Sequence, residues 1–461
     1  MDLRDLTGTL SQTVASLERD LPYASALCTR RSGVAVRVTG KQAAVEPTDP
    51  MLGCVLSAFT GRAFVEVSTT DLAPAGMAAA AAQLRSRALE AGVDPHGPVV
   101  DPGPPLQRQW TTHEQVPAAD VPLADKVARA HDLRARVGRD PRTVHSVARI
   151  GDVQSQELFV NRTRTLFQDL RRAEAVAFLV MQDGPNQAEL YGGRSRAGGF
   201  EHCQLTDALM DEIVHDCGRL MGAGRVEPGL HHCVFAPDFA GLFAHEAFGH
   251  GTEADMFLKR RARGQQYLGK RVASDLVNMF DSPALPGHAA TFHFDHEGQL
   301  AGETQIIRDG VLLSAITNLD AALRLGLPRT SNGRRESFER KVYTRMTNTY
   351  FGGGCSSVEE VFAGVDQGLF ITHGSNGMED PKGWGIQCEG YLAEEIRGGK
   401  RTGKVFSPVI VTGFVPDLLQ SISAVSREVE ITGLGMCGKG HKEWVKVTDG
   451  GPYLRLHARV A

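Results

Sequence analysis

The sequence predicts an α+β fold with two domains, and three observations lead to this expectation. The chain has 461 residues, which is more than one domain usually contains. Its first half mixes helical periodicity with closely spaced strand-like segments, which favour antiparallel pairing. Its last third consists of short strand-like segments separated by glycine-rich turns. We therefore expect an N-terminal domain of helices and antiparallel sheet over residues 1–225 and a C-terminal domain over residues 226–461.

Local patterns predict the elements of the first domain. Helical patterns predict helices over 3–21, 122–139 and 205–221, and an alanine-rich run that follows N-cap residues and Pro74 predicts a helix over 75–91. Alternation and β-branched residues predict strands over 33–38, 63–68, 144–150, 156–161, 164–169 and 175–182. A proline- and glycine-rich passage near 94–120 is expected to be a surface connector. We interpret the glycine-rich segment 192–199 as a turn, because it lacks the strand and helix context of a nucleotide-binding loop.

Fewer elements can be predicted in the second domain. Strands are expected over 291–294, 303–308 and 311–314, and a helix over 357–364. His231, His232 and Cys233 are potential metal ligands, but neighbouring side chains in a strand point to opposite faces. We therefore interpret these three residues as core and surface positions rather than as one metal site.

Composition argues against several classes of protein. A net charge of −4 and the lack of a long basic tract give no indication of nucleic acid or a membrane surface. The first residues lack the basic-then-apolar order of a signal peptide, and no apolar run is long enough to span a membrane. The eight cysteines include no C-x-x-C pair, which weakens a thiol-redox function. We expect a cytoplasmic protein with reduced cysteines.

The segment with the most chemical information is His245-Glu246-x-x-x-His250. Imidazoles are good zinc ligands, and a neighbouring carboxylate can take a proton from water held by the metal. The familiar H-E-x-x-H helix has its histidines at i and i+4, whereas here the second lies at i+5. A straight helix would point the two imidazoles about 140° apart. We therefore expect the backbone to leave the helix or form a π-bulge before His250, with Gly249 and Gly251 supplying backbone freedom.

A catalytic zinc site needs a third protein ligand and an open position. Spacing alone leaves seven candidates open: Glu253, Asp255, His288, His293, His296, Cys388 and Cys437. Cys437 lies in the glycine-rich segment 433–440, where the backbone could carry its thiol close to another element. Mixed cysteine and histidine ligation is an established catalytic zinc arrangement.

Three motifs in this order give the chain a specific resemblance to a known family. The first is HEAFGHGTEAD at residues 245–255. The second is RTSNGRRES at 329–337 followed by RMTNTY at 345–350, and the third is GLGMCGK at 433–439. Together they resemble the TldD/PmbA family of metallopeptidases, on the catalytic TldD side, and the resemblance runs over essentially the whole chain.

This resemblance implies a zinc peptidase in which His245, His250 and Cys437 hold one zinc ion per catalytic chain and Glu246 is the catalytic carboxylate. It implies two α+β domains, with a closed or nearly closed, barrel-like β-structure around the site in the C-terminal domain. Members of the family form homodimers, or heterodimers with a related subunit that lacks the metal motif. Their enclosed cleft admits unfolded peptides in an extended form.

We therefore expect a metallopeptidase that hydrolyses peptide bonds in unfolded polypeptides or in small peptide precursors and conjugates, as in peptide or natural-product maturation. The alternative is a non-catalytic peptide-binding subunit of a TldD/PmbA-type dimer. Two segments, 376–385 and 441–461, depart from the family pattern. Because neither contains a proposed ligand, they bear on the choice of substrate rather than on the metal.

Overall fold

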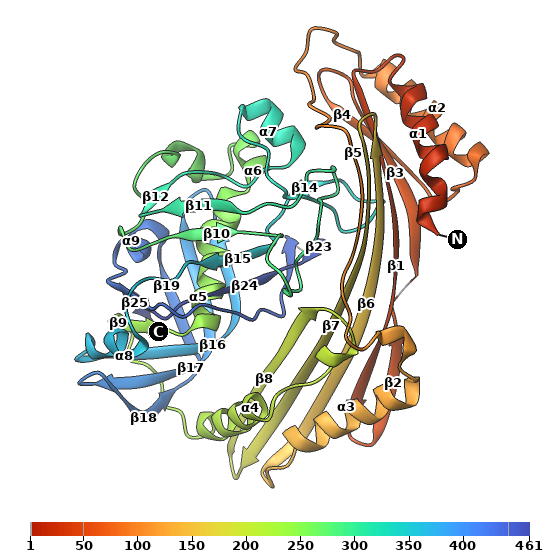
Figure 1. The fold of residues 1–461 in the computed structure, drawn as a ribbon. Helices are drawn as coiled ribbons and strands as arrows, with labels where there is room; N and C mark the ends of the chain where they lie inside the picture. The colour runs from red at the N-terminus through yellow and green to blue at the C-terminus, as the bar shows by residue number, and fades with distance from the viewer. Residues whose placement is uncertain (1, 49, 441) are drawn as a thin grey trace.

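The structure is a computed structural model that describes residues 2–48, 50–440 and 442–461. A long curved sheet formed by the first part of the chain stands beside a mainly β region formed by the second part (Figure 1). Helices and strands occur in both parts, which confirms the α+β fold expected from the sequence. Within the residues described, no helix is both long enough and apolar enough to cross a membrane.

The amino-terminal sheet has the strand order β4-β3-β1-β6-β7-β5, with β2 beside β1 and β8 beside β7. Its strands are β1 (Tyr23–Thr39), β2 (Gln42–Pro47), β3 (Met51–Phe59), β4 (Phe64–Thr69), β5 (Leu106–Thr111), β6 (Thr143–Asn161), β7 (Arg164–Asp183) and β8 (Asn186–Ala197). The pairing of β5 with β7 is parallel, and the other strand pairs are antiparallel. β6 and β7 were each predicted as two short strands. They are continuous because the polar residues between the predicted segments, such as Asp152 and Glu174, remain paired across the ladder.

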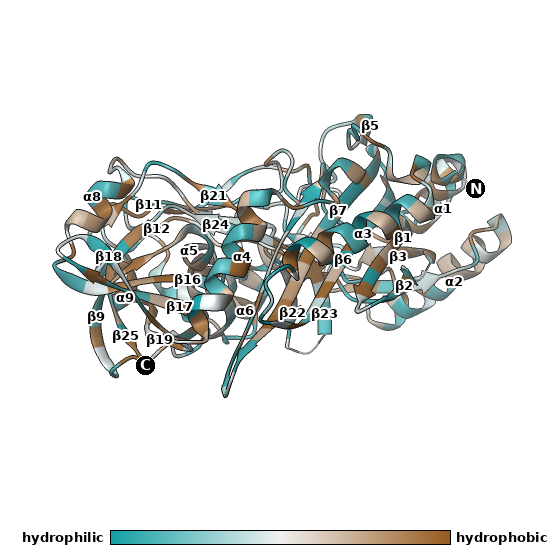
Figure 2. Ribbon diagram, turned by 90° about the horizontal axis from the view of Figure 1, so that it is seen from below, coloured by the Kyte–Doolittle hydropathy of each residue, from teal (hydrophilic) through white to brown (hydrophobic). Residues whose placement is uncertain are grey.

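Four helices cover the two ends of this sheet (Figures 1 and 2). They are α1 (Thr7–Leu17), α2 (Pro74–Glu90), α3 (Leu123–Val137) and α4 (Asp207–Leu220), and three 3-10 turns accompany them at Leu3–Leu6, Ala118–Asp120 and Phe200–His202. The helices α1 and α2 share a core with β1 and β3, to which Leu10 and Leu84 contribute. The helices α3 and α4 form a second core through Leu133 and Ile213. All four helices were expected from the sequence.

Two segments of the first part differ from the expectation. The passage 94–120 was predicted to be a connector, yet β5 lies within it and extends the sheet. The segment 192–199 was predicted to be a turn, yet most of it belongs to β8. A Cβ atom at Gly192 would lie 2.5 Å from Ile213 Cδ1, and one at Gly193 would lie 2.5 Å from the carbonyl oxygen of Ala175. These glycines therefore permit close packing within a strand.

The second part of the chain contains a closed five-stranded barrel, β16-β9-β25-β19-β17, in which β17 pairs back with β16. The strands of the barrel and the two that extend it are β9 (Gly229–Phe235), β16 (Gln367–Asp380), β17 (Gly385–Arg397), β18 (Lys400–Phe406), β19 (Val409–Phe414), β20 (Ala424–Val425) and β25 (Leu454–Val460). This confirms the barrel-like structure that the family resemblance implied. His231, His232 and Cys233 lie in β9, as expected for a strand.

A six-stranded sheet and two hairpins complete this region. The sheet contains β10 (Met279–Asp281), β11 (Thr304–Arg308), β12 (Val311–Leu312), β15 (Asn348–Phe351), β21 (Glu430–Ile431) and β24 (Thr448–Gly451). The hairpins are β13 (Gly333–Arg334) with β14 (Tyr343–Thr344), and β22 (Met436–Lys439) with β23 (Lys442–Lys446). The helices are α5 (Pro237–Ala244), α6 (Ala254–Leu258), α7 (Leu319–Leu325), α8 (Val358–Ala363) and α9 (Val415–Gln420), with a 3-10 turn at Arg263–Tyr267.

Most elements predicted for this region are present. The strands β11 and β12 and the helix α8 were expected, and α8 begins with a capping box formed by Ser357 and Glu360. The expected strand at 291–294 is absent. The N–H of His293 donates instead to the side-chain oxygen of Gln168 at 2.8 Å. The backbone of this segment is thus used to join the two parts of the molecule.

Candidate metal centre

The candidate centre begins where α5 continues into an irregular turn. α5 is largely buried, and His245–Gly249 follow it as a single π-helical turn. The N–H of His250 donates to the carbonyl oxygen of His245, five residues earlier. This geometry confirms the expectation that the backbone leaves the α-helix before His250. It brings the two imidazole rings to a centroid separation of 5.1 Å, at an interplanar angle of 89°.

The glycines beside His250 have a different role from the one expected. Gly249 has ordinary helical angles, φ −61° and ψ −64°. A Cβ atom there would lie 2.0 Å from Met346 Sδ, and one at Gly251 would lie 2.7 Å from Glu379 Oε1. The expectation that these glycines supply conformational freedom is corrected: they make room for side chains packed around the π turn.

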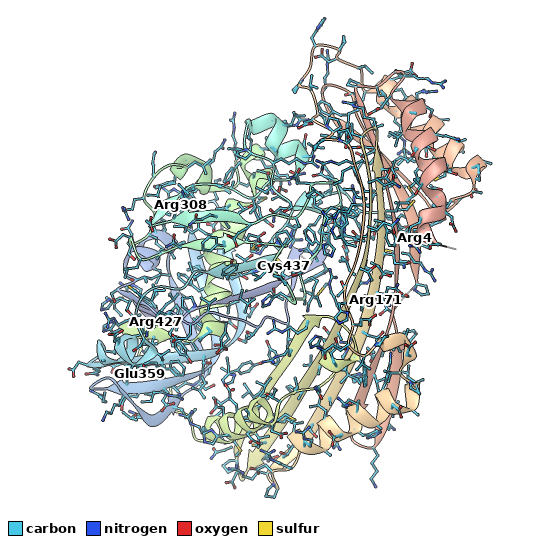
Figure 3. All side chains as sticks on the ribbon, viewed as in Figure 1. Arg4, Arg171, Arg308, Glu359, Arg427 and Cys437 are labelled. Carbon is cyan, nitrogen blue, oxygen red and sulfur yellow. The ribbon has the colours of Figure 1, made fainter. Side chains whose placement is uncertain are left out.

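Three potential metal ligands converge at this turn. His245 Nε2 lies 3.2 Å from Cys437 Sγ, and His250 Nε2 lies 3.4 Å from the same sulfur. Tetrahedral nitrogen and sulfur ligands of one zinc ion are about 3.6 Å apart, as the usual bond lengths require. The two nitrogens and the sulfur therefore fit a zinc ion after a small expansion. Cys437 comes from β22 (Figure 3), so the third ligand atom is supplied by the far end of the chain.

The other candidates for a third ligand lie elsewhere or are already engaged. Three histidines have partners remote from the centre: His288 contacts Arg196, His293 stacks on Trp110, and His296 contacts Glu157. Cys388 is buried in β17, where burial and Glu246 hold the pKa of its thiol well above the usual range. Glu253 and Asp255 lie behind the ligand group, as described below.

Mutual electrostatics favour a thiolate between two imidazoles. Burial opposes ionisation of Cys437, but His250 and His245 hold the pKa of its thiol well below the usual value of 9.0. Burial likewise opposes protonation of His245, but Cys437 raises the pKa of its imidazole to about 8. The pKa of His250 is raised well above 6.5 by Cys437 and Glu253, against the effect of burial. A thiolate is the form of cysteine that binds metals.

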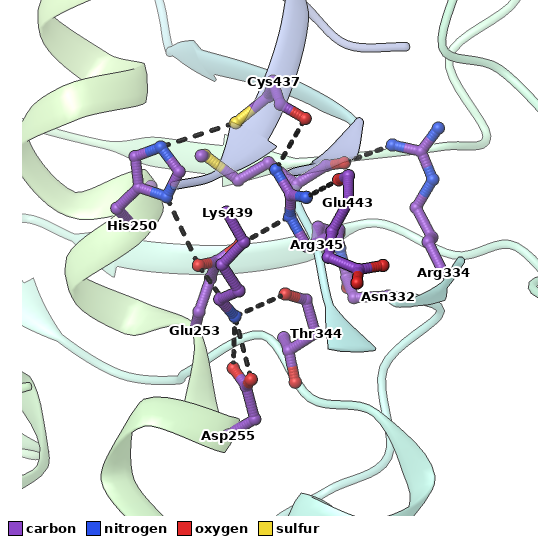
Figure 4. A network of polar contacts seen from close by, with 12 residues as sticks. His250, Glu253, Asp255, Asn332, Arg334, Thr344, Arg345, Cys437, Lys439 and Glu443 are labelled. Atoms are coloured by element: carbon purple, nitrogen blue, oxygen red, sulfur yellow. Dashed lines mark hydrogen bonds and ion pairs between the residues drawn. The ribbon is translucent and has the colours of Figure 1, made fainter. Parts of the chain in front are cut away.

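A buried carboxylate supports His250 from behind (Figure 4). Glu253 Oε2 accepts from His250 Nδ1 at 3.3 Å and lies 3.2 Å from Lys439 Nζ. Lys439 also donates to both carboxylate oxygens of Asp255, at 2.7 and 2.8 Å. Against the cost of burial, Lys439, His250 and Arg345 hold the pKa of Glu253 below its usual range. The hydrogen bond to Nδ1 leaves Nε2 of His250 free to face Cys437.

Arg345 ties this network to the hairpin β22–β23 (Figure 4). Its side chain is 1% exposed and donates to Glu253 at 3.2 Å. It also donates to the carbonyl oxygen of Cys437 at 2.8 Å and to that of Glu443. Arg345 belongs to the family motif RMTNTY, but the motif by itself indicates no role for it. Its packing could not be recognised from spacing, because its partners lie more than 90 residues away in the chain.

Glu246 lies beside the ligands at the wall of a cleft of about 940 Å³. This cleft is bounded by β8, by residues 372–377 of β16 and by the segment 432–436. A Cβ atom at Gly377 would lie 2.3 Å from Glu246 Cγ, so a side chain at that position would displace the carboxylate. Gly377 belongs to the segment 376–385, which departs from the family pattern and forms the end of β16 and the start of β17.

Two further carboxyl groups, which the sequence did not indicate, lie near Glu246. Both oxygens of Glu379 are buried without a hydrogen-bond partner among the described residues, and burial and Glu246 hold its pKa well above the usual range. Burial raises the pKa of Asp449 to about 6, aided by Glu246. No motif spacing marks either residue. Asp449 lines the cleft, which therefore holds a protonatable group beyond the predicted one.

A second group of possible ligands, Glu212, Asp216 and His373, lies in the same cleft. Asp216 is already paired with His373 at 2.9 Å and with Arg219 at 3.1 Å. Against burial, these partners hold the pKa of Asp216 below its usual range. The group is therefore an ion-pair cluster of the cleft wall.

Comparisons with known proteins identify the family of this chain. Residues 228–461 match the model of the PmbA/TldA metallopeptidase C-terminal domain. A protein of Methanothermobacter thermautotrophicus named metalloprotease is 30% identical over 369 residues, which cover 77% of this chain and 78% of the relative. A protein of Saccharolobus solfataricus named zinc metalloprotease TldD homolog is 27% identical over 325 residues, covering 68% of this chain and 70% of the relative.

A solved structure shows the same fold over the whole chain. TldE of Thermococcus kodakarensis superposes with a TM-score of 0.77 at 15% identity, covering 98% of this chain and 100% of that chain. The family model and the sequence relatives are those of metallopeptidases, and the superposition shows the shared fold. This chain belongs to the PmbA/TldD family, as its motifs led us to expect.

Proposed function

We propose that this chain is a zinc metallopeptidase, with residues 226–461 as the metal-binding catalytic domain. His245, His250 and Cys437 would hold one zinc ion per chain, and Glu246 would act as the general base. The observation that carries this proposal is the convergence of two imidazole nitrogens and one sulfur, all within 4.8 Å of one another, at the edge of a large cleft. When bound, zinc supplies Lewis acidity that acidifies water and polarises a peptide carbonyl.

The side chains around the ligands prepare the site for this chemistry. Arg345 holds the backbone of Cys437, and Glu253 fixes the ring of His250 through Nδ1. A carboxylate oxygen of Glu246 takes the proton of the attacking water and later delivers it to the leaving amine. Glu246 is only 8% exposed, so little bulk water competes for its oxygens. Such a fixed, partly dry setting strengthens proton transfer and charge stabilisation.

We propose that the substrate is an unfolded polypeptide, a small peptide precursor or a peptide conjugate, bound in an extended form in the cleft. The volume of about 940 Å³ exceeds that of a single amino acid and suits several residues. The protein would act in the cytoplasm, as a homodimer or with a related subunit. The likeness to TldE supports a partner of the same fold.

The test combines metal analysis with peptide hydrolysis. We expect the purified protein to contain about one zinc ion per chain, as a single catalytic site requires, and Cys437→Ser to lose most of it. Glu246→Gln should keep the zinc and lose most turnover of casein and of a panel of short peptides. Cys355→Ser, which changes the exposed cysteine outside the site, is the matched control.

Three results would count against the proposal. If Glu246→Gln hydrolyses peptides at the parent rate, the general-base role is wrong. If Cys437→Ser retains its zinc, the ligand set is wrong. A parent protein that cannot take up zinc would instead support the non-catalytic peptide-binding subunit.

A further inference from the structure

A second cavity, of about 90 Å³, lies between the amino-terminal sheet and the hairpin β22–β23. The sheet contributes alternate residues of one face, as the register of β1, β6 and β7 requires. The opposite wall consists of residues 292–296, the segment 334–338 and the hairpin. Neither the ligands nor Glu246 line this cavity, so it is distinct from the candidate metal centre.

The sheet presents cationic and hydroxyl donors without partners to this cavity. Arg31 and Arg172 both line it, and neither side chain has a hydrogen-bond or ion-pair partner within the described residues. Three buried atoms of the lining also lack a partner in that part of the chain: Thr29 Oγ1, Arg172 Nε and Arg335 Nε. A buried donor that makes no hydrogen bond is destabilising. Several of them around one cavity indicate a missing acceptor.

The opposite wall adds two cations, Arg334 and Lys446, whose hydrogen bonds go to backbone carbonyl oxygens. Arg334 is 6% exposed and donates to the carbonyl oxygens of Met346 and Lys446. Lys446 donates to the carbonyl oxygen of Leu434 at 2.8 Å. The nearest carboxylate to Lys446, that of Glu174, is 3.8 Å away. Burial lowers the pKa of Arg172 to about 10, that of Arg334 to about 9 and that of Lys446 to about 8.

The carboxylates that line the cavity accept hydrogen bonds from groups other than Arg31 and Arg172. Glu157 accepts from Gln168 at 2.7 Å and contacts His296 at 3.4 Å. Asp295 accepts three backbone N–H groups, and Glu336 accepts the N–H of Glu443. Arg335 differs from the other arginines because Glu66 pairs with it. The lining carries five cationic side chains, Arg31, Arg172, Arg334, Arg335 and Lys446, against three carboxyl groups, Glu157, Asp295 and Glu336, so positive charge is in excess.

We propose that this cavity binds a small oxyanion, of the phosphate, sulfate or carboxylate type. Guanidinium groups match two oxygens of such an anion at once, whereas a halide offers a single centre. The free hydroxyl of Thr29 would add a donor for a third oxygen. A volume of about 90 Å³ accommodates an anion of a few heavy atoms and excludes a nucleotide or peptide.

The anion would join the sheet to the hairpin that carries Cys437. In β22 and β23, Met436 pairs with Lys446, and both line the cavity, whereas Cys437 is the next residue along the strand and points to the other face. Anion binding would thus hold Arg172 of the sheet and Lys446 of the hairpin together behind the metal centre. This inference does not depend on the proposed zinc chemistry.

The test is calorimetric titration of the dialysed full-length protein at constant ionic strength. Inorganic phosphate should bind at one saturable site. Arg172→Met should weaken binding about tenfold or more, because a bidentate charge-assisted contact is lost. Arg37→Met is the matched control: Arg37 lies on β1 of the same sheet but is exposed and paired with Glu46, so its loss should leave the affinity unchanged. Arg31→Met provides a second variant if Arg172→Met does not fold.

Acetate and chloride complete the experiment. Binding of acetate would support the inference and would point to a peptide carboxylate as the source of the anion. An anion released from acid-denatured parent, but not from Arg172→Met, would also support it, because a tightly held ion survives dialysis. The inference would be overturned if chloride bound as tightly as phosphate, or if both arginine variants kept the parent affinity for phosphate. It would also be overturned if the parent neither bound phosphate nor released an anion on denaturation.

Discussion

The carboxylate of Glu253 is the most informative position for a single isosteric change. It lies between three cationic groups: Arg345 Nε at 3.2 Å, Lys439 Nζ at 3.2 Å and His250 Nδ1 at 3.3 Å. Glu253→Gln keeps the size and one oxygen acceptor. It removes the charge and turns an N–H group toward at least one of the three donors. His250 then loses its carboxylate acceptor, and the buried guanidinium of Arg345 loses the negative charge beside it.

The magnitude follows from what the neighbours retain. Removing one partner of a buried ion pair typically costs about 3–5 kcal/mol. Here Lys439 keeps both oxygens of Asp255, and Arg345 keeps the carbonyl oxygens of Cys437 and Glu443. We therefore expect the free energy of unfolding to fall by about 1.5–3 kcal/mol, the contribution of one hydrogen bond to a charged group. Zinc should bind about 10–100-fold more weakly, because His250 loses its orienting acceptor.

Two assays measure these quantities: urea unfolding of the metal-free protein, and zinc competition with a chelator of known affinity. Glu359→Gln is the control, because Glu359 is an exposed residue in the first turn of α8. If Glu253→Gln binds zinc as tightly as the parent, then the hydrogen bond to Nδ1 does not position His250. If its stability is also unchanged, the buried network does not hold this part of the fold together.

Three further predictions concern the cleft, the metal and a buried carboxyl pair. Gly377→Ala should lower kcat about 100-fold while the zinc content stays at the parent value, because the new methyl group displaces Glu246. A kcat equal to that of the parent would show that the carboxylate can move without loss of activity. Chelation of the metal should lower the melting temperature, and added zinc should restore it, since an ion bound only by the folded state stabilises that state. Equal melting temperatures with and without zinc would contradict a metal site in the folded state. Burial and Asp295 raise the pKa of Glu297 from 4.5 to about 8, so the folded chain keeps a proton that the unfolded chain releases, and stability should fall as pH rises from 4.5 to 8. Glu297→Gln should flatten this decline in a series of urea unfolding curves, and an unchanged slope would refute the assignment.

The sequence was informative wherever the signal was local. Helical patterns located α3 and α4 to within a few residues, because one face of each helix packs on the sheet, and an alanine-rich run after N-cap residues located α2 equally well. The i to i+5 spacing of His245 and His250 required a departure from the α-helix, and the π turn is that departure. By contrast, the lengths of β6 and β7 depended on pairing with neighbouring strands. The sequence shows no strand pattern where polar residues occupy half-buried positions of these strands.

The sequence by itself determined the α+β class, the family and a pair of histidines beside a carboxylate, because these features lie in short contiguous segments. Residue spacing left seven candidates for a third ligand, of which the family resemblance indicated Cys437, and only the tertiary structure shows that Cys437 lies beside the two histidines. Cys437 lies 187 residues from His250 in the chain, and the barrel and the hairpin β22–β23 bring it within 3.4 Å. The cationic cavity likewise exists only where the sheet meets that hairpin, since its donors come from segments hundreds of residues apart. Contacts of this kind follow from chain topology, which no local spacing encodes.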